Sequence, residues 1–147
     1  MVILNNHTSK SQWCCSNKDG DGLWWSREWP EYLFFEHCEM FAKRYKDNPR
    51  VIGFDLRNEL RKAHGVAATW GDGNPKTDWK RAAKIAGEKV LKIAPHWLVF
   101  VSGLGYQLDL TPINDSPLEY SVKNRLVYSG HFYGFSWPVP SWKMVSY

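Results

Sequence analysis

The chain has 147 residues, of which 44% are hydrophobic, and its aromatic residues are 9 Trp, 7 Tyr and 7 Phe. This length fits one domain spanning 1–147, and so much apolar surface excludes a disordered chain. The basic residues behind the net charge of +4 are spread along helical patterns, which argues against a nucleic-acid partner. No apolar run approaches the ~20 residues of a membrane helix, and no basic segment precedes Val2, so we expect neither a membrane span nor a signal peptide.

Short apolar runs alternate with helical patterns along the chain. In order, we expect a strand at Val2–Leu4, a helix from Pro30 to about Lys46, a strand at Val51–Leu56, a helix from Thr77 or Asp78 to about Ala94, a strand at Trp97–Val101, a turn or two of helix around Leu118 and a strand at Leu126–Tyr128. The strands show little polar alternation, which is typical of burial on both faces. This order predicts an α/β fold with a parallel sheet of about four strands and right-handed crossover helices.

Polar side chains follow each predicted strand. They are Asn5, Asn6 and His7 after the first strand, Asn58 and Glu59 after the second, Ser102 and Gly103 after the third, and His131 and Tyr133 after the fourth. Ligands of parallel α/β folds bind at the carboxyl ends of the strands. The pattern therefore predicts an active site at that edge of the sheet.

Glu59 is the strongest candidate for chemistry. A carboxyl group at the rim of a barrel is partly desolvated, which would raise its pKa and suit it to general-acid catalysis. The neighbouring amide of Asn58 could hold a substrate hydroxyl. The alternative is a surface glutamate paired with Arg57 or Arg61.

The three cysteines leave their pairing open. Adjacent cysteines rarely bond each other, so Cys14 or Cys15 would pair with Cys38 or with a cysteine outside the chain, unless all three are reduced thiols. A zinc set can be written from these cysteines and two histidines, namely His7, Cys14, Cys15, His37 and Cys38. Because the pairs lack the spacing of a structural zinc site, no metal is predicted.

Three segments together resemble the family 5 glycoside hydrolases, which are retaining glycosidases with a (β/α)8, or TIM, barrel. The segments similar to barrel strands three, four and six are V-I-L-N-N-H-T-S (2–9), R-Y-K-D-N-P-R-V-I-G-F-D-L-R-N-E-L-R (44–61) and L-V-Y-S-G-H-F-Y (126–133). The sequence N-E-L-R and the insert W-C-C-S-N-K-D-G-D-G-L-W-W (13–25) resemble a cellulase-like subgroup. The resemblance implies a partial barrel comprising strands three to six.

The resemblance also implies roles for the residues that match. Glu59 would be the general acid and then the base, and Asn58 would bind the sugar 2-OH. His131 and Tyr133 would lie beside the nucleophile, for which this chain has no matching position. His7 would bind a sugar hydroxyl or steady the carboxylates. The chemistry needs no cofactor. The implied partner is an oligo- or polysaccharide with β-linkages, and full-length relatives would be extracellular.

The sequence leaves several alternatives open. The tryptophans of the insert, Trp13, Trp24 and Trp25, could stack on sugar rings or pack in the core, and Trp137 and Trp142 could form a second stacking wall. The histidines and Tyr133 could simply cap the sheet. The chain could also be a carbohydrate-binding remnant without catalysis, or a truncated fragment. A partial barrel would leave open sheet edges, through which we expect self-association.

Overall fold

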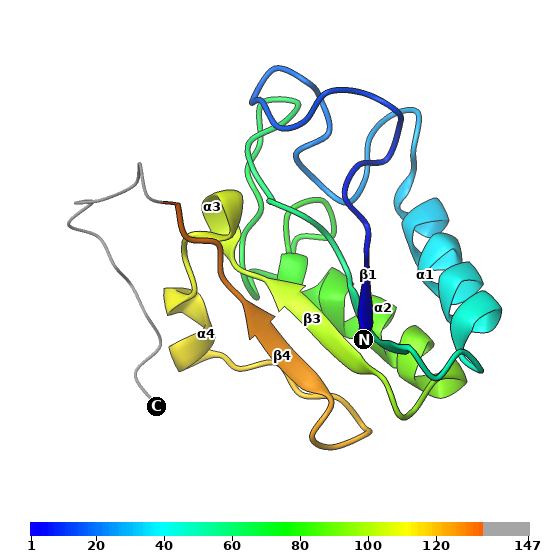
Figure 1. The fold of residues 1–147 in the computed structure, drawn as a ribbon. Coiled ribbons are helices and arrows are strands. Elements are labelled where there is room, and N and C mark those ends of the chain that lie inside the picture. Colours follow the sequence, from blue (N-terminus) through cyan, green and yellow to red (C-terminus); the bar gives the residue numbers. More distant parts are fainter. Residues whose placement is uncertain (134–147) are drawn as a thin grey trace.

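Four parallel strands form the central sheet of the computed structural model, which describes residues 1–133. The strands are β1 (Val2–Asn5), β2 (Val51–Asp55), β3 (Leu98–Ser102) and β4 (Leu126–Ser129). They lie side by side in chain order, and the long loops gather where the strands end (Figure 1). Each strand end lies within one residue of the predicted end. The predicted parallel α/β sheet is therefore confirmed.

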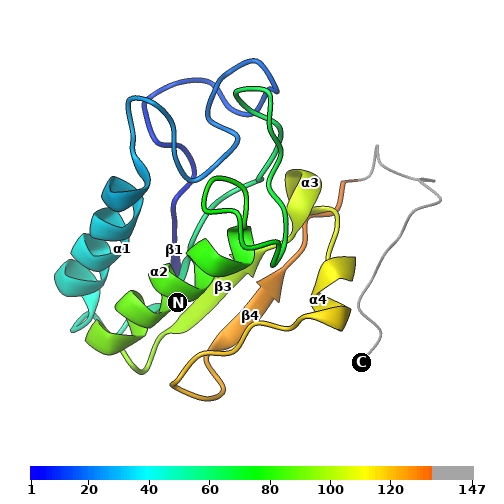
Figure 2. The same cartoon turned by 180° about the vertical axis from the view of Figure 1, so that it is seen from behind.

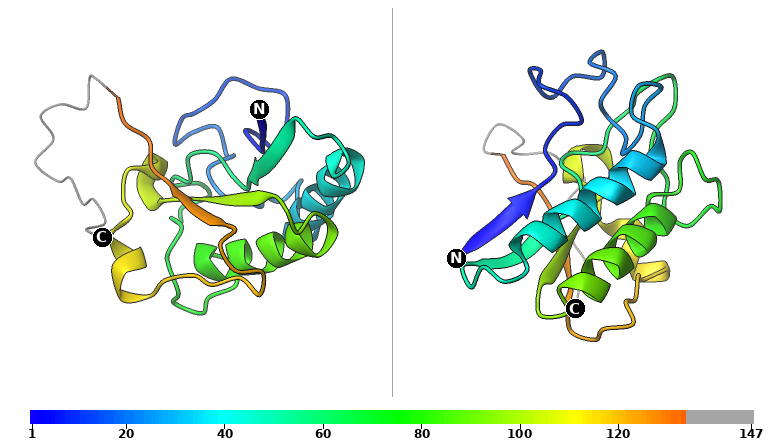
Figure 3. Two further views of the ribbon diagram at one scale, coloured as in Figure 1. Left: turned by 60° about the horizontal axis from the view of Figure 1, so that its bottom comes forward. Right: turned by 90° about the vertical axis from the view of Figure 1, so that its right-hand side faces the viewer.

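Two long helices cover one face of this sheet. Helix α1 (Glu31–Tyr45) and helix α2 (Trp79–Ile93) lie side by side on that face, as Figures 2 and 3 show. The first turn of α2 begins after Asp78, whose carboxylate accepts a hydrogen bond from the backbone N–H of Arg81 (3.0 Å). A side-chain acceptor at this position satisfies a helix donor that has no partner inside the helix. Asp78 is thus one of the two residues at which the sequence predicted this helix to begin.

The core lies between these helices and the sheet. Trp79, Trp97 and Phe54 are among its largest fully buried side chains. The indole N–H of Trp79 donates to the carbonyl oxygen of Ser102 (3.0 Å), so its one polar atom is satisfied inside the core. This contact joins the start of α2 to the carboxyl end of β3, the edge of the sheet where the site lies.

The connection between β3 and β4 differs from the prediction. It contains two short helices, α3 (Leu104–Gln107) and α4 (Thr111–Asp115), whereas the helical turn expected around Leu118 is absent from the structure of this segment. Pro112 favours the first turn of α4, and Pro117 disfavours helical backbone at the residue before it. The backbone N–H of Leu118 instead donates to the hydroxyl of Tyr128 (2.7 Å).

The prediction that all four strands are buried on both faces is wrong for the edge strands. β2 and β3 are largely buried, but Val2 and Ile3 of β1 are 44% and 45% exposed, and β4 is only partly buried. In the described part of the chain the long helices cover one face, and β1 and β4 each pair on one side only. Self-association through these edges stays a prediction. No helix among the described residues is long and apolar enough to cross a membrane.

Candidate active site

Glu59 lies just after β2 with its backbone held in an unusual conformation. Its φ of 43° falls in the left-handed region, which residues other than glycine rarely adopt. Two buried side chains hold this backbone: the Glu59 N–H donates to Oε1 of Gln107 (2.8 Å), and the Glu59 carbonyl accepts from Nη1 of Arg61 (2.9 Å). Such conformations persist where the surroundings fix them, often at functional sites.

The carboxylate of Glu59 meets two side chains that follow β4. His131 Nδ1 lies 2.9 Å from Glu59 Oε1, and the hydroxyl of Tyr133 donates to the same oxygen. These three residues border a pocket of about 530 Å³. Its lining is His7, Cys14, Cys15, Asn58, Glu59, Tyr106, Leu108, His131 and Tyr133. The structure therefore brings together five of the residues singled out in the sequence, namely His7, Asn58, Glu59, His131 and Tyr133.

The pKa of Glu59 corrects one expectation. Burial does raise it, as the sequence suggested, but the hydrogen bonds from Tyr133 and His131 favour the ionised form and outweigh burial. The pKa of the Glu59 carboxyl therefore lies below its usual range. The same contact raises the pKa of Tyr133 to about 12, because ionised Tyr133 would lose its hydrogen bond to Glu59.

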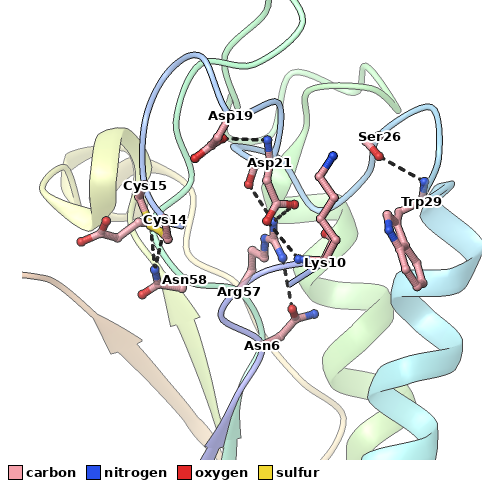
Figure 4. Close-up of polar contacts among 12 residues, drawn as sticks. Asn6, Lys10, Cys14, Cys15, Asp19, Asp21, Ser26, Trp29, Arg57 and Asn58 are labelled. Carbon is pink, nitrogen blue, oxygen red and sulfur yellow. Dashed lines mark hydrogen bonds and ion pairs between the residues drawn. A yellow bond between two sulfur atoms is a disulfide. The ribbon is translucent and has the colours of Figure 1, made fainter. Parts of the chain in front are cut away.

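Two buried arginines flank the Asn58–Glu59 pair and bind the 13–25 loop. Arg57 Nη2 contacts Asp21 Oδ1 at 2.7 Å (Figure 4). Arg61 Nη2 contacts Asp19 Oδ2 at 2.5 Å. All four side chains are at most 10% exposed. The alternative in which Arg57 or Arg61 forms an ion pair with Glu59 is therefore wrong. The sequence did not predict that Arg57 and Arg61 hold this loop. Their positions on either side of Asn58–Glu59 were the only signal for it.

A chain of hydrogen bonds connects His7 to Asp55, the last residue of β2. His7 Nδ1 lies 3.0 Å from Asn5 Oδ1, and Asn5 Nδ2 donates to Asp55 Oδ2 (2.9 Å). Because the amide oxygen of Asn5 can only accept, Nδ1 of His7 carries the proton. The other ring nitrogen, Nε2, is then an acceptor for a ligand hydroxyl. Asp55 does not line the pocket, and its link to His7 through Asn5 was not predicted from the sequence.

Replacing Asp55 by Asn is expected to stabilise the fold at high pH only. Burial raises the pKa of Asp55 from 3.8 to about 6, despite the hydrogen bond from Asn5 and the proximity of His131. Ionised Asp55 therefore destabilises the fold above pH ~6, and this cost disappears below pH ~4. Urea unfolding of Asp55→Asn should show a gain of about 3 kcal/mol near pH ~8 and little gain near pH ~4. An equal change at both pH values would contradict this assignment.

The tryptophans of the insert do not share one role. Trp24 is 1% exposed, packs against Trp79 and donates its indole N–H to Glu31 (2.8 Å), so the prediction that it stacks on a sugar is wrong. Trp25 lies against His64, outside the pocket lining. Trp13 is 93% exposed beside Cys14, and its stacking role stays a prediction. Trp137 and Trp142 lie outside the described residues.

The cysteine pairing differs from every form predicted from the sequence. Cys14 and Cys15 form a disulfide with each other, and Cys38 is a free thiol buried on α1. Burial raises the pKa of the Cys38 thiol well above its usual value. Of the zinc set written from the sequence, the structure groups only His7, Cys14 and Cys15. Since the two sulfurs are joined in a disulfide, they are not available as thiolate ligands in this state.

The four parallel strands lie in sequential order, and a pocket lined by Glu59 lies at their carboxyl ends. This arrangement defines the chain as part of a (β/α) barrel, in which the active site lies at the carboxyl ends of the strands. Comparison with known proteins identifies which barrel. The chain belongs to the cellulase family (glycosyl hydrolase family 5), whose model matches residues 1–143. The resemblance seen in the sequence is thereby confirmed.

Individual relatives agree with this family. An endoglucanase from Paenibacillus polymyxa is 41% identical over 76% of this chain and 30% of its own length. The major extracellular endoglucanase of Xanthomonas campestris pv. campestris is 35% identical over 90% of this chain and 28% of its own. A cellotetraose complex of an endocellulase from Pyrococcus horikoshii superposes with a TM-score of 0.78 and 32% identity, covering 92% of this chain and 41% of that one. The chain thus spans less than a third of the length of these two endoglucanases.

Proposed function

We propose that this chain supplies the acid/base part of a retaining glycosidase site that hydrolyses β-linked glucans. The observation that carries this proposal is the contact of His131 and Tyr133 with one carboxylate oxygen of Glu59, inside a pocket at the strand ends. Membership of the cellulase family and the cellotetraose bound by a similar structure support a β-glucan as substrate. A relative named as extracellular supports secretion of the full-length protein.

Glu59 first acts as an acid and then as a base. Because His131 and Tyr133 both contact Oε1, we assign the proton transfer to Oε2, which protonates the glycosidic oxygen as the bond to C1 breaks. In the second step the ionised carboxylate takes a proton from the attacking water. Asn58 binds the sugar 2-OH, a contact that strengthens in the transition state, and His7 Nε2 accepts from another sugar hydroxyl.

A retaining reaction also needs a nucleophilic carboxylate, about 5–5.5 Å from the first. Glu59 is the sole carboxylic acid lining the pocket in the described part of the chain. We therefore place the nucleophile outside this chain. In the intact site, a second carboxylate at that distance would oppose ionisation of Glu59 and raise its pKa, which suits a general acid.

Sodium azide can stand in for the nucleophile and so tests this function. With an aryl β-cellobioside as substrate, azide attacks C1, the C1–oxygen bond breaks and the aryloxide leaves, giving cellobiosyl azide. We expect aryloxide release that depends on azide and is saturated by substrate, and unchanged release for Glu119→Gln, which alters an exposed carboxylate outside the pocket. Binding of cellotetraose without azide-dependent release would instead favour a carbohydrate-binding remnant. If the chain neither binds cellotetraose nor releases the aryloxide, the proposed function is overturned.

A further inference from the structure

The disulfide between Cys14 and Cys15 lies in the wall of the pocket. Both residues are partly buried and line it together with Asn58 and Glu59. Figure 4 shows the two sulfurs above the side chain of Asn58, on the loop that follows β1. Disulfide sulfur presents a soft, apolar and polarisable surface, which suits contact with the C–H face of a sugar ring. None of the roles assigned above uses this pair.

The sulfurs also contact the amide of Asn58. Asn58 Nδ2 lies 3.6 Å from Cys15 Sγ and 4.0 Å from Cys14 Sγ. A disulfide sulfur accepts weakly and has no proton to donate, so it favours the amide orientation with nitrogen toward sulfur. The amide oxygen then faces away from the disulfide. The backbone of Asn58 is held separately, because its N–H donates to the carbonyl of Asn6 (3.0 Å).

Arg61, three residues after Asn58, anchors the loop that carries the disulfide. Arg61 Nε donates to the carbonyl of Ser16 (3.2 Å), one residue after Cys15, and Arg61 also contacts Asp19. The same Arg61 donates to the carbonyl of Glu59. The buried guanidinium of Arg61 therefore connects the loop that carries the disulfide to the backbone of Glu59. The sulfurs are held at a fixed place relative to Asn58 and Glu59.

We propose that the Cys14–Cys15 disulfide is a positioning element that sets the amide orientation of Asn58 and forms an apolar wall for a bound sugar ring. This inference rests on the proposed function, because it takes the pocket as a glycan site. A dithiol reductant breaks the S–S bond: the dithiol gives up two electrons and two protons and becomes a cyclic disulfide, and Cys14 and Cys15 become thiols. Because a thiol can also donate a hydrogen bond, the reduced pair no longer selects one orientation of the Asn58 amide.

Cellotetraose affinity and the Asn58 amide signals, each measured before and after reduction by dithiothreitol, test this proposal. We expect reduction to weaken cellotetraose binding by about tenfold, roughly the effect of one hydrogen bond. We also expect it to shift the side-chain 1H–15N signals of Asn58 in the absence of sugar. The Cys14→Ser/Cys15→Ser variant should match the reduced parent and should not respond to dithiothreitol, because Cys38 is buried and unpaired. Mass spectrometry after alkylation verifies that reduction exposes two thiols.

The two proposals can fail separately. Unchanged affinity and unmoved Asn58 signals after verified reduction would overturn the positioning role while leaving the glycan site intact. If the oxidised parent binds no cellotetraose, the proposed function fails and the sugar wall fails with it. The Asn58 signals alone then decide the positioning role: a shift on reduction supports it, and no shift overturns it.

Discussion

The Glu59→Gln variant is expected to cleave cellobiosides with poor leaving groups about 10²–10⁴-fold more slowly than the parent in the azide assay, which is the usual contribution of general acid catalysis. Gln cannot donate a carboxyl proton to the departing oxygen, although it keeps nearly the same shape. A dinitrophenyl leaving group needs little protonation, so its release should change only slightly. Steady-state rates with phenyl and dinitrophenyl β-cellobioside measure this difference.

The dependence on the leaving group distinguishes acid catalysis from a structural role. An equal loss with both substrates would show that Glu59→Gln disrupts the pocket and would contradict the assignment. The rate with the poor leaving group should also fall as the pH rises above the pKa of Glu59, because only the protonated carboxyl can act as an acid. Glu119→Gln is the matched control, since Glu119 lies on the surface and borders no part of this pocket.

The Arg57→Met variant is expected to lose about 3–5 kcal/mol of unfolding free energy, because it leaves the carboxylate of Asp21 buried without its counter-charge. Arg57 and Asp21 are 1% and 4% exposed, and the guanidinium also donates to the Asp21 carbonyl (2.7 Å). Urea unfolding monitored by tryptophan fluorescence measures the change. A loss of this size is a large part of the stability of an ordinary domain.

Two further variants test the reason for that loss. Adding Asp21→Asn to Arg57→Met should recover part of it, because the second change removes the uncompensated charge. Lys43→Met removes an exposed partner of Glu39 at 3.6 Å and should cost no more than about 1 kcal/mol. If Arg57→Met is as mild as Lys43→Met, the buried pair does not hold the loop.

The sequence predicts the sheet, the two long helices and the position of the pocket, because these depend on local patterns. Apolar runs predict the strands, and polar residues directly after them, such as Asn58 and His131, lie at one edge of any parallel sheet. The Arg57–Asp21 pair could not be predicted in this way. It joins positions 36 residues apart, and the loop conformation that brings them together depends on the whole core.

The wrong predictions have a similar origin. Trp24 and Trp13 lie in the same loop and look alike in sequence, but only the tertiary fold decides that one packs on Trp79 and the other faces solvent. The pKa of Glu59 was expected to rise because burial was the visible effect. The opposing hydrogen bonds come from His131 and Tyr133, more than 70 residues away. Such balances between distant groups depend on the tertiary fold.

The anomeric configuration of the cellobiosyl azide formed by this chain tests most directly whether Glu59 works in a site whose nucleophile lies outside the chain. We predict the α-azide by NMR, because azide then displaces the aryloxide of a β-cellobioside in one step with inversion. The β-azide would require two successive displacements. It would therefore show that a protein carboxylate, supplied by this chain or by a second copy, already acts as the nucleophile, and would contradict this assignment.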